Sequence, residues 1–223
     1  MYENVQVART KSRRQYAVIT ADVVGSRQLE SFRAKRDRRL AAVSRMHQSQ
    51  KAILSPYTVT AWDEFQAILS KPEDVSRVIL DLRRIFYPWQ LRIAVGIGSV
   101  SAAHKRPINQ YAGGEAFERA RQAADRMKEG SPKNRLFTDF ESGNELFDAI
   151  ANTIYRLQDA LLERITARQW ATINARVETA RQEATARRLS LDASTVSRNL
   201  KRGYYWHLID TAEVMERIVR AYF

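Results

Sequence analysis

The stretch that decides the C-terminal part of the fold reads Ala180-Arg-Gln-Glu-Ala-Thr-Ala-Arg-Arg-Leu-Ser-Leu-Asp-Ala-Ser-Thr-Val-Ser-Arg-Asn-Leu-Lys-Arg-Gly203. Its pattern predicts two short helices joined by a tight turn. The residues expected on the buried side are apolar: Ala186, Leu189, Leu191, Val196 and Leu200. The residues expected on the outer side of the second helix are polar or basic: Ser194, Thr195, Ser197, Arg198, Lys201 and Arg202. This layout is typical of a helix-turn-helix whose second helix enters the major groove of DNA.

The ends of the second helix carry further signals. We expect Ser194 to cap its N-terminus, because a serine side chain there accepts a hydrogen bond from a free backbone amide. Ser190 stands in the turn where many such motifs have glycine. Gly203 is expected to end the helix, and the aromatic residues 204–206 are expected to pack against a wing or a partner helix. Such patterns also arise by chance in helix-rich proteins, so an adaptor module that binds protein stays open as an alternative.

Composition narrows the class of protein. The chain has 223 residues, a net charge of +12 and no cysteine. The positive charge favours a nucleic-acid partner, because Lys and Arg neutralise phosphates, although a basic protein background would also produce it. The absence of cysteine excludes disulfides and thiolate metal sites. No apolar run approaches the roughly 20 residues that span a bilayer, and residues 1–14 lack the apolar segment of a secretory signal. We therefore expect a cytoplasmic protein with no membrane partner.

Strand-like and helix-like segments alternate upstream of the helix-turn-helix. Strands are predicted at 16–22, 57–61, 65–69, 91–98 and 135–139, and helices at 29–54, 72–87 and 115–128. This order predicts an α+β fold with a ferredoxin-like or palm arrangement, which we place at residues 1–143. An all-α domain is expected at residues 144–223. It begins with a connector helix at 144–165 and continues into the helix-turn-helix, with or without a wing.

Two carboxylates are expected to meet on the predicted sheet. Asp22 ends the first strand, and Asp63 lies at the tip of the hairpin that pairs beside it. Two convergent carboxylates suit a Mg²⁺ ion that also holds nucleotide phosphates. Gly25 and Ser26 lead into the long helix, whose N-terminus favours anions. The alternative is that both acids serve only turns or helix caps.

Three segments resemble the SatD family of bacterial proteins: Ala21-Asp-Val-Val-Gly-Ser-Arg27, Asp63-Glu-Phe-Gln-Ala-Ile-Leu69 and Thr195-Val-Ser-Arg-Asn-Leu-Lys-Arg-Gly-Tyr-Tyr205. The resemblance covers most of the chain, from Tyr16 to Tyr205. It implies an N-terminal domain similar to the palm of class III nucleotidyl cyclases and diguanylate cyclases. It also implies a C-terminal helix-turn-helix.

The match to the cyclases is partial when it is followed residue by residue. Asp22 and Asp63 match the two metal carboxylates, and Arg121 matches an arginine that stabilises phosphate charge. Trp62 stands where the cyclases have a glycine, so it would fill the nucleotide space or stack on a base. Phe117 stands where they have an asparagine that orients the ribose. The resemblance therefore implies a nucleotide-binding or purely structural palm rather than an active cyclase.

Together these patterns predict a DNA-binding protein, a transcriptional regulator whose palm-like domain senses a nucleotide or mediates assembly. The alternative is a Mg²⁺-dependent nucleotidyl cyclase or transferase with a DNA-binding appendage. A regulator that reads a two-fold DNA site is expected to be a homodimer. The amphipathic segment 209–223 would form the dimer contact or else pack on its own domain. It carries Val214, Met215, Ile218, Val219 and Phe223.

Overall fold

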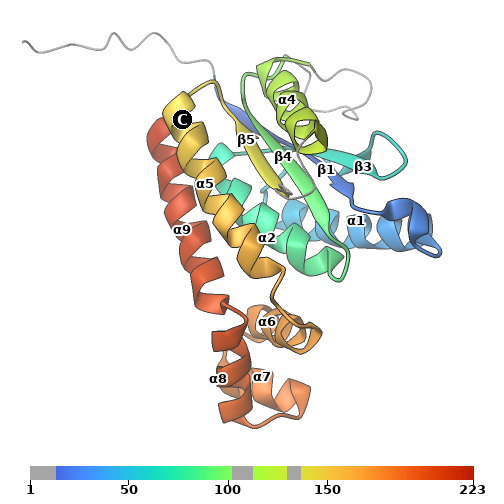
Figure 1. Cartoon of the computed structure of the whole chain (residues 1–223), viewed down its shortest axis with the longest axis vertical. Coiled ribbons are helices and arrows are strands. Elements are labelled where there is room, and N and C mark those ends of the chain that lie inside the picture. Colours follow the sequence, from blue (N-terminus) through green and yellow to red (C-terminus); the bar gives the residue numbers. More distant parts are fainter. Residues whose placement is uncertain (1–13, 102–112, 130–136) are drawn as a thin grey trace, which may run out of the picture.

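The computed structural model describes residues 14–101, 113–129 and 137–223 (Figure 1). A mixed five-stranded sheet forms its centre. The strands are β1 (Tyr16–Val23), β2 (Thr58–Val59), β3 (Glu64–Leu69), β4 (Leu91–Gly98) and β5 (Thr138–Glu141). Their order is β2-β3-β1-β4-β5, and adjacent strands are antiparallel except for the parallel pair β4 and β5. The α+β class predicted from the sequence is confirmed.

Each strand sends alternate side chains to the two faces of the sheet. Ala17, Ile19 and Ala21 of β1 lie in the main hydrophobic core. Tyr16 and Val18 lie on the other face, in a smaller cluster with α4 (Glu115–Glu129). This register fixes the surroundings of the candidate acids, because Asp22 and the residues paired with it share the α4 face.

Helices cover both faces of the sheet, as Figure 1 shows. The main core is closed by α1 (Phe32–Ser49), α2 (Val75–Phe86), α5 (Glu145–Leu162) and α9 (Tyr205–Tyr222). Two short 3₁₀ helices, η1 (Ser26–Gln28) and η2 (Pro72–Asp74), precede α1 and α2. On the opposite face α4 lies very close to β4. A Cβ added at Gly96 would come within 2.0 Å of the Ala116 carbonyl oxygen, so this position requires glycine.

Several predicted boundaries differ from the structure. The helix expected at 29–54 begins only at Phe32, after Ser31 with its left-handed φ of 51°, and it ends at Ser49. The chain then leaves the helix to run beside β3, where the Leu54 amide donates to the Ile68 carbonyl. The strand expected at 57–61 is only two residues long, because the next residues form the hairpin turn. The last predicted strand begins at Thr138, and residues 135 and 136 lie outside the described residues.

The C-terminal part is helical, as predicted. It contains α6 (Ala167–Thr179), α7 (Gln182–Leu189) and α8 (Ala193–Arg202), which precede α9. A reciprocal capping box starts α6: Thr166 accepts from the Gln169 amide, and the Gln169 side chain accepts from the Thr166 amide. No strand occurs in residues 142–223, all of which are described, so the optional wing is absent. The aromatic residues 204–206 lead into α9 instead.

The last helix is longer than predicted and returns to the sheet. It starts at Tyr205 rather than near residue 209, and Figure 1 shows it running beside α5. Met215 and Val219 are fully buried in the main core with Phe147 and Tyr155 of α5. Met215 and Val219 therefore pack within the chain, which is the second of the two alternatives for this segment, and a dimer contact through exposed residues such as Val214 stays a prediction. A homodimer through another surface stays a prediction.

The domain division proposed at residues 143 and 144 also stays a prediction. Helices from beyond that point complete the core of the sheet, and the smaller helical core in turn includes Leu80 of α2. Within the described ranges, no helix is both long and apolar enough to cross a membrane.

Candidate functional site

The candidate DNA-binding element consists of α7, a three-residue turn and α8. Ser190 adopts the left-handed conformation, with φ 52° and ψ 47°, at the C-terminus of α7. The Leu191 amide donates to the Ala186 carbonyl and closes the turn. The N-cap of α8 is Asp192, and its side chain makes no capping hydrogen bond. The prediction that Ser194 caps this helix is therefore wrong, because Ser194 lies inside the first turn.

The two sides of α8 differ as the sequence predicted. Val196 and Leu200 are fully buried and pack in a cluster with Trp170 and Ile173 of α6 and Ala186 of α7. The outer side carries five of the six predicted DNA-binding residues in exposed positions: Ser194, Ser197, Arg198, Lys201 and Arg202. Thr195 is half-buried, and its hydroxyl accepts a hydrogen bond from Arg198 Nη2 at 3.0 Å. The structure thus gathers all six residues on one helix.

Further basic side chains extend from α7. Arg187 and Arg188 in its last turn are exposed, as is Arg181 just before the helix. Arg188 forms an ion pair with Glu178 of α6. These residues were within the motif segment but were not assigned a role, because the sequence pattern identifies only the second helix as the groove-facing one.

The acidic site lies where β1 ends and β3 begins, on adjacent antiparallel strands as predicted. The register places Asp22 opposite Glu64 on one side and Arg92 on the other. Oδ2 of Asp22 accepts from Arg92 Nη2 at 2.6 Å and from Nε at 3.1 Å. Ser26 Oγ donates to Asp63 Oδ2 at 2.5 Å. Each carboxylate therefore already accepts a hydrogen bond from another side chain of the protein.

The pKa of Asp22 is shifted by its surroundings in the folded protein. Burial raises the pKa of Asp22 above its ordinary value, and the nearby Asp63 charge adds to this effect. The Arg92 hydrogen bond and charge act in the opposite direction and do not cancel it. Loss of hydration is therefore a larger contribution to the raised pKa than repulsion between the two acids.

A Mg²⁺ ion at the acidic site stays a prediction. Among the described residues, no three acidic or histidine side chains converge as a metal group. Glu64, the nearest further acid by register, lies 3.9 Å from Lys128 Nζ and 4.0 Å from Arg121 Nη1. Mg²⁺ commonly takes one or two carboxylates from a protein and completes its coordination with phosphates and waters, so the number of acids suffices, although Arg92 holds one of them.

The other predicted nucleotide-site residues lie around this acidic site. Gly25 is left-handed with φ 68°, just before the buried Ser26. Trp62 is 46% exposed, and its ring stacks on Phe32 with the Arg33 guanidinium 4.1 Å from the ring centroid. The indole is therefore held against α1 while it keeps an accessible surface.

Two residues of α4 complete the predicted set. Arg121 is exposed and lies 3.4 Å from Asp125 on the same helix. Phe117 packs against the small cluster of Val18 and Ala120. The structure thus brings Arg121 near the site through Glu64, but it uses Phe117 for packing.

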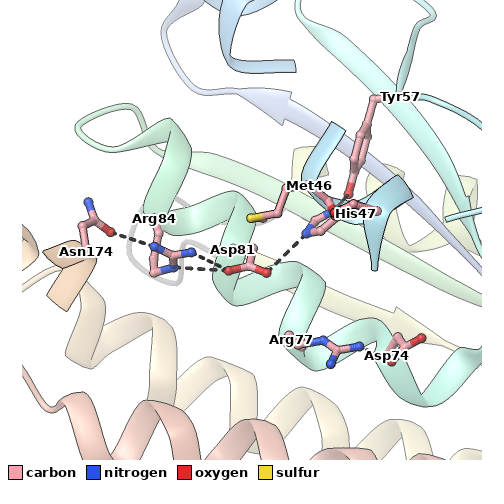
Figure 2. A network of polar contacts seen from close by, with 9 residues as sticks. Met46, His47, Tyr57, Asp74, Arg77, Asp81, Arg84 and Asn174 are labelled. Atoms are coloured by element: carbon pink, nitrogen blue, oxygen red, sulfur yellow. Dashed lines mark hydrogen bonds and ion pairs between the residues drawn. The ribbon is translucent and has the colours of Figure 1, made fainter. Parts of the chain in front are cut away.

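A buried polar network was not predicted from the sequence (Figure 2). His47 of α1 contacts the Tyr57 hydroxyl at 3.0 Å and Asp81 Oδ2 at 3.3 Å. Arg84 donates to Asp81 Oδ1 at 2.7 Å and to Asn174 Oδ1 at 3.3 Å. The network therefore connects α1 and α2 to α6. Its members are scattered singly along the sequence, so no local motif indicates it.

The chain, an α+β sheet with a helical C-terminal part, is similar to known proteins. A family model described as "SatD family" matches residues 16–208, and the chain belongs to the SatD family. No curated protein matches the chain. A similar solved structure is a regulator of polyketide synthase expression from Bifidobacterium adolescentis. It is 14% identical with a TM-score of 0.29, and the match covers 92% of this chain and 82% of that chain. A likeness this weak carries no argument about function.

Proposed function

We propose that this protein binds duplex DNA through α8 and acts as a transcriptional regulator. The observation that carries the proposal is the two-sided character of α8. Its inner residues Val196 and Leu200 are fully buried, whereas its outer serines, arginines and lysine are exposed. The tight left-handed turn at Ser190 sets α8 beside α7 as a helix-turn-helix requires.

The chemistry of α8 suits a DNA groove. Ser194 and Ser197 lie towards its N-terminus, where small polar side chains permit close approach to base edges. Arg198, Lys201 and Arg202 follow towards its C-terminus and offer charge to backbone phosphates. The net charge of +12 adds a long-range attraction for nucleic acid.

The α/β part is proposed to be a palm-like domain that senses a nucleotide or mediates assembly. In support, the strands β2-β3-β1-β4 have the order of a split βαβ fold, with every adjacent pair antiparallel. Nucleotide phosphates near Asp22 would bind to Arg92, to a Mg²⁺ ion held by Asp22 and Asp63, or to both. Asp22 and Asp63 favour the alternative, a cyclase or transferase, whereas Trp62 and Phe117 count against it.

The DNA-binding proposal is tested by the salt dependence of affinity. Titrating a mixed-sequence duplex with the wild type and with Arg198→Ala/Lys201→Ala, at several salt concentrations, measures the phosphate contacts. The double variant should bind more weakly and lose about 0.9 from the log–log salt slope for each contact removed. Fluorescence anisotropy of a labelled duplex gives both quantities.

A matched control separates these contacts from overall charge. Arg156→Ala/Arg217→Ala removes the same charge from exposed positions on α5 and α9. This control should keep the wild-type slope apart from a small change in long-range attraction. Equal losses in the two double variants would show that α8 is not the contact surface, and no binding by the wild type would end the proposal.

A further inference from the structure

One side of α5 carries an apolar stripe that the rest of the described chain leaves largely open. Leu146 and Leu157 are 62% and 66% exposed, more than any other large hydrophobic residue in the described ranges. The residues between and beside them follow at helical spacing, so they share one face of the helix. The α5 stripe, as we name it, consists of Leu146, Ala149, Ile150, Thr153, Leu157, Ala160 and Leu161. Only Ile150 and Leu161 are half-buried, and the others are exposed.

The α5 stripe contains no charged residue. Two acids of the helix face the sheet instead: Asp148 accepts from the Ser142 amide at 3.1 Å. Asp159 accepts from Arg83 at 3.0 Å. A helix face that meets only water usually carries charged and polar side chains. From residue 146 to residue 161 the uncharged stripe is about 23 Å long, at a rise of about 1.5 Å per residue. A continuous apolar surface of this length marks a place where another molecule binds.

The neighbouring helix widens this surface. α9 runs beside α5 (Figure 1), and the ring of Tyr222 lies 5.5 Å from the ring of Phe147 in the first turn of α5. Tyr222 and Val214 of α9 are each 38% exposed. A stable interface buries about 800 Å² on each partner. One side of one helix offers less than this area, so both helices are needed and we expect association at micromolar concentrations.

The spacing along the α5 stripe suits a second copy of the chain. In a two-fold interface the same surface is used by both partners, so it has to be complementary to itself. Leu146 and Leu161 lie equally far from the middle of the stripe, and so do Ile150 and Leu157. The intervals from Leu146 through Ile150 and Thr153 to Leu157 are four, three and four residues, the alternation that helices show when they pair side by side.

A membrane surface suits the α5 stripe less well. Helices that lie on membranes carry Lys and Arg beside their apolar face, because these residues attract anionic lipids. α5 instead has a single arginine, Arg156, and three acids: Glu145, Asp148 and Asp159.

We propose that the α5 stripe, together with Val214 and Tyr222 of α9, pairs with the same surface of a second copy of the chain around a two-fold axis. The two α5 helices pack side by side, and each copy buries the exposed Leu146 and Leu157 of the other. This surface goes beyond the proposed DNA binding and involves none of the residues assigned to it.

The direction of pairing bears on DNA binding. The end of α5 leads into the helical part that carries α8, as Figure 1 shows. If the two α5 helices run in the same direction, both copies of α8 lie at the same end of the dimer, where a two-fold DNA site can meet them. This direction rests on the proposed function, whereas the pairing itself does not.

The pairing is tested by the mass of the full-length protein in solution without DNA. Sedimentation equilibrium over micromolar concentrations should show a monomer–dimer equilibrium for the wild type. Leu157→Glu should raise the dimer dissociation constant at least about hundredfold, because each interface would bury two unpaired carboxylates. Leu157 is 66% exposed in the single chain, so this variant should fold and keep the wild-type circular dichroism.

Val177→Glu is the matched control. It makes the same kind of change at a position of α6 that is 37% exposed and lies outside the α5 stripe, so its dimer should be unchanged. Equal losses in the two variants would overturn the inference. A wild type that stays monomeric would also overturn it, and sedimentation with vesicles of anionic phospholipid would then assign the stripe to a membrane.

Single cysteines determine the direction of pairing, because the chain has none of its own. A disulfide requires Cα atoms within about 7 Å of each other. Under a mild oxidant, Leu146→Cys should form a linked dimer by itself if the helices run in the same direction. A link that forms only when Leu146→Cys is mixed with Leu161→Cys would keep the dimer and overturn the arrangement with both α8 helices at one end. Because no DNA is used, loss of the proposed DNA binding would leave these results unchanged.

Discussion

Asp22 shows how a residue can be found from the sequence while its chemistry cannot. Its place at the end of a strand and its match to the resembled family identify it as a candidate site residue. The arginine that holds it lies 70 positions away on β4, and only the register of the sheet brings Asp22 opposite Arg92. A strand pattern predicts which face a residue occupies but gives no register between distant strands. The ion pair was therefore not predictable.

The residues around Asp22 predict that the protein does not turn over ATP or GTP with Mg²⁺ or Mn²⁺. Attack on the α-phosphate requires an aligned 3′-hydroxyl and stabilisation of the developing charge. Phe117, which packs against Val18 and Ala120, cannot align the ribose. Chromatography of nucleotide mixtures after long incubation checks this. Cyclic or oligomeric products that disappear in Asp63→Ala would contradict it and favour the enzyme alternative.

The elements with the clearest periodicity were the best predicted. The strand at 91–98 has the predicted bounds, because it is an apolar segment interrupted only by Arg92 and buried almost throughout. The helix expected at 115–128 matches α4 within one residue. The errors fall where tertiary contacts decide the backbone. Ser31 and Tyr204 adopt left-handed conformations without being glycine, so no residue pattern indicated that α1 and α9 begin just after them.

At the level of packed elements, the network that links α1, α2 and α6 predicts that Asp81→Asn lowers the free energy of unfolding by an amount that depends on pH. Burial alone would raise the pKa of Asp81, but the His47 hydrogen bond and the Arg84 charge outweigh it and lower the pKa. The ionised carboxylate therefore contributes stability above its ordinary pKa of 3.8, and this contribution is lost as pH falls through the lower pKa of the folded state. Removing one partner of a buried pair costs about 3–5 kcal/mol.

Urea unfolding of the wild type and Asp81→Asn at pH 7 and below pH 3.8 measures this difference. The gap in unfolding free energy should be large at neutral pH and should shrink in acid. Asp125→Asn removes a half-exposed partner of Arg121 on α4 and serves as control, with an expected change of about 0–1 kcal/mol. A loss in Asp81→Asn that does not depend on pH would show that the charge of Asp81 is not what stabilises the network.

On the scale of the whole molecule, the sequence predicted two regions but not how they are joined. Amphipathic patterns show that a helix has an apolar side, but not which partner covers it. The smaller helical core therefore includes Leu80 of α2, and the main core includes Met215 of α9. The sequence pattern of neither helix indicates this packing.

The return of α9 to the sheet predicts that Met215→Ala weakens the fold rather than the association of chains. Met215 is fully buried in the main core, so its truncation should lower the free energy of unfolding by about 2–5 kcal/mol. Val214, its neighbour, is 38% exposed, and Val214→Ala should change stability by about 0.5 kcal/mol or less. Urea unfolding measures both effects, and sedimentation velocity records the mass of each variant.

If α9 were instead a dimer contact, Met215→Ala would shift the mass towards monomer, and the unfolding midpoint of Leu157→Glu, which lacks the proposed α5 contact, would rise with protein concentration. A midpoint that is independent of concentration, together with a large loss in Met215→Ala alone, is the result that packing within the chain requires.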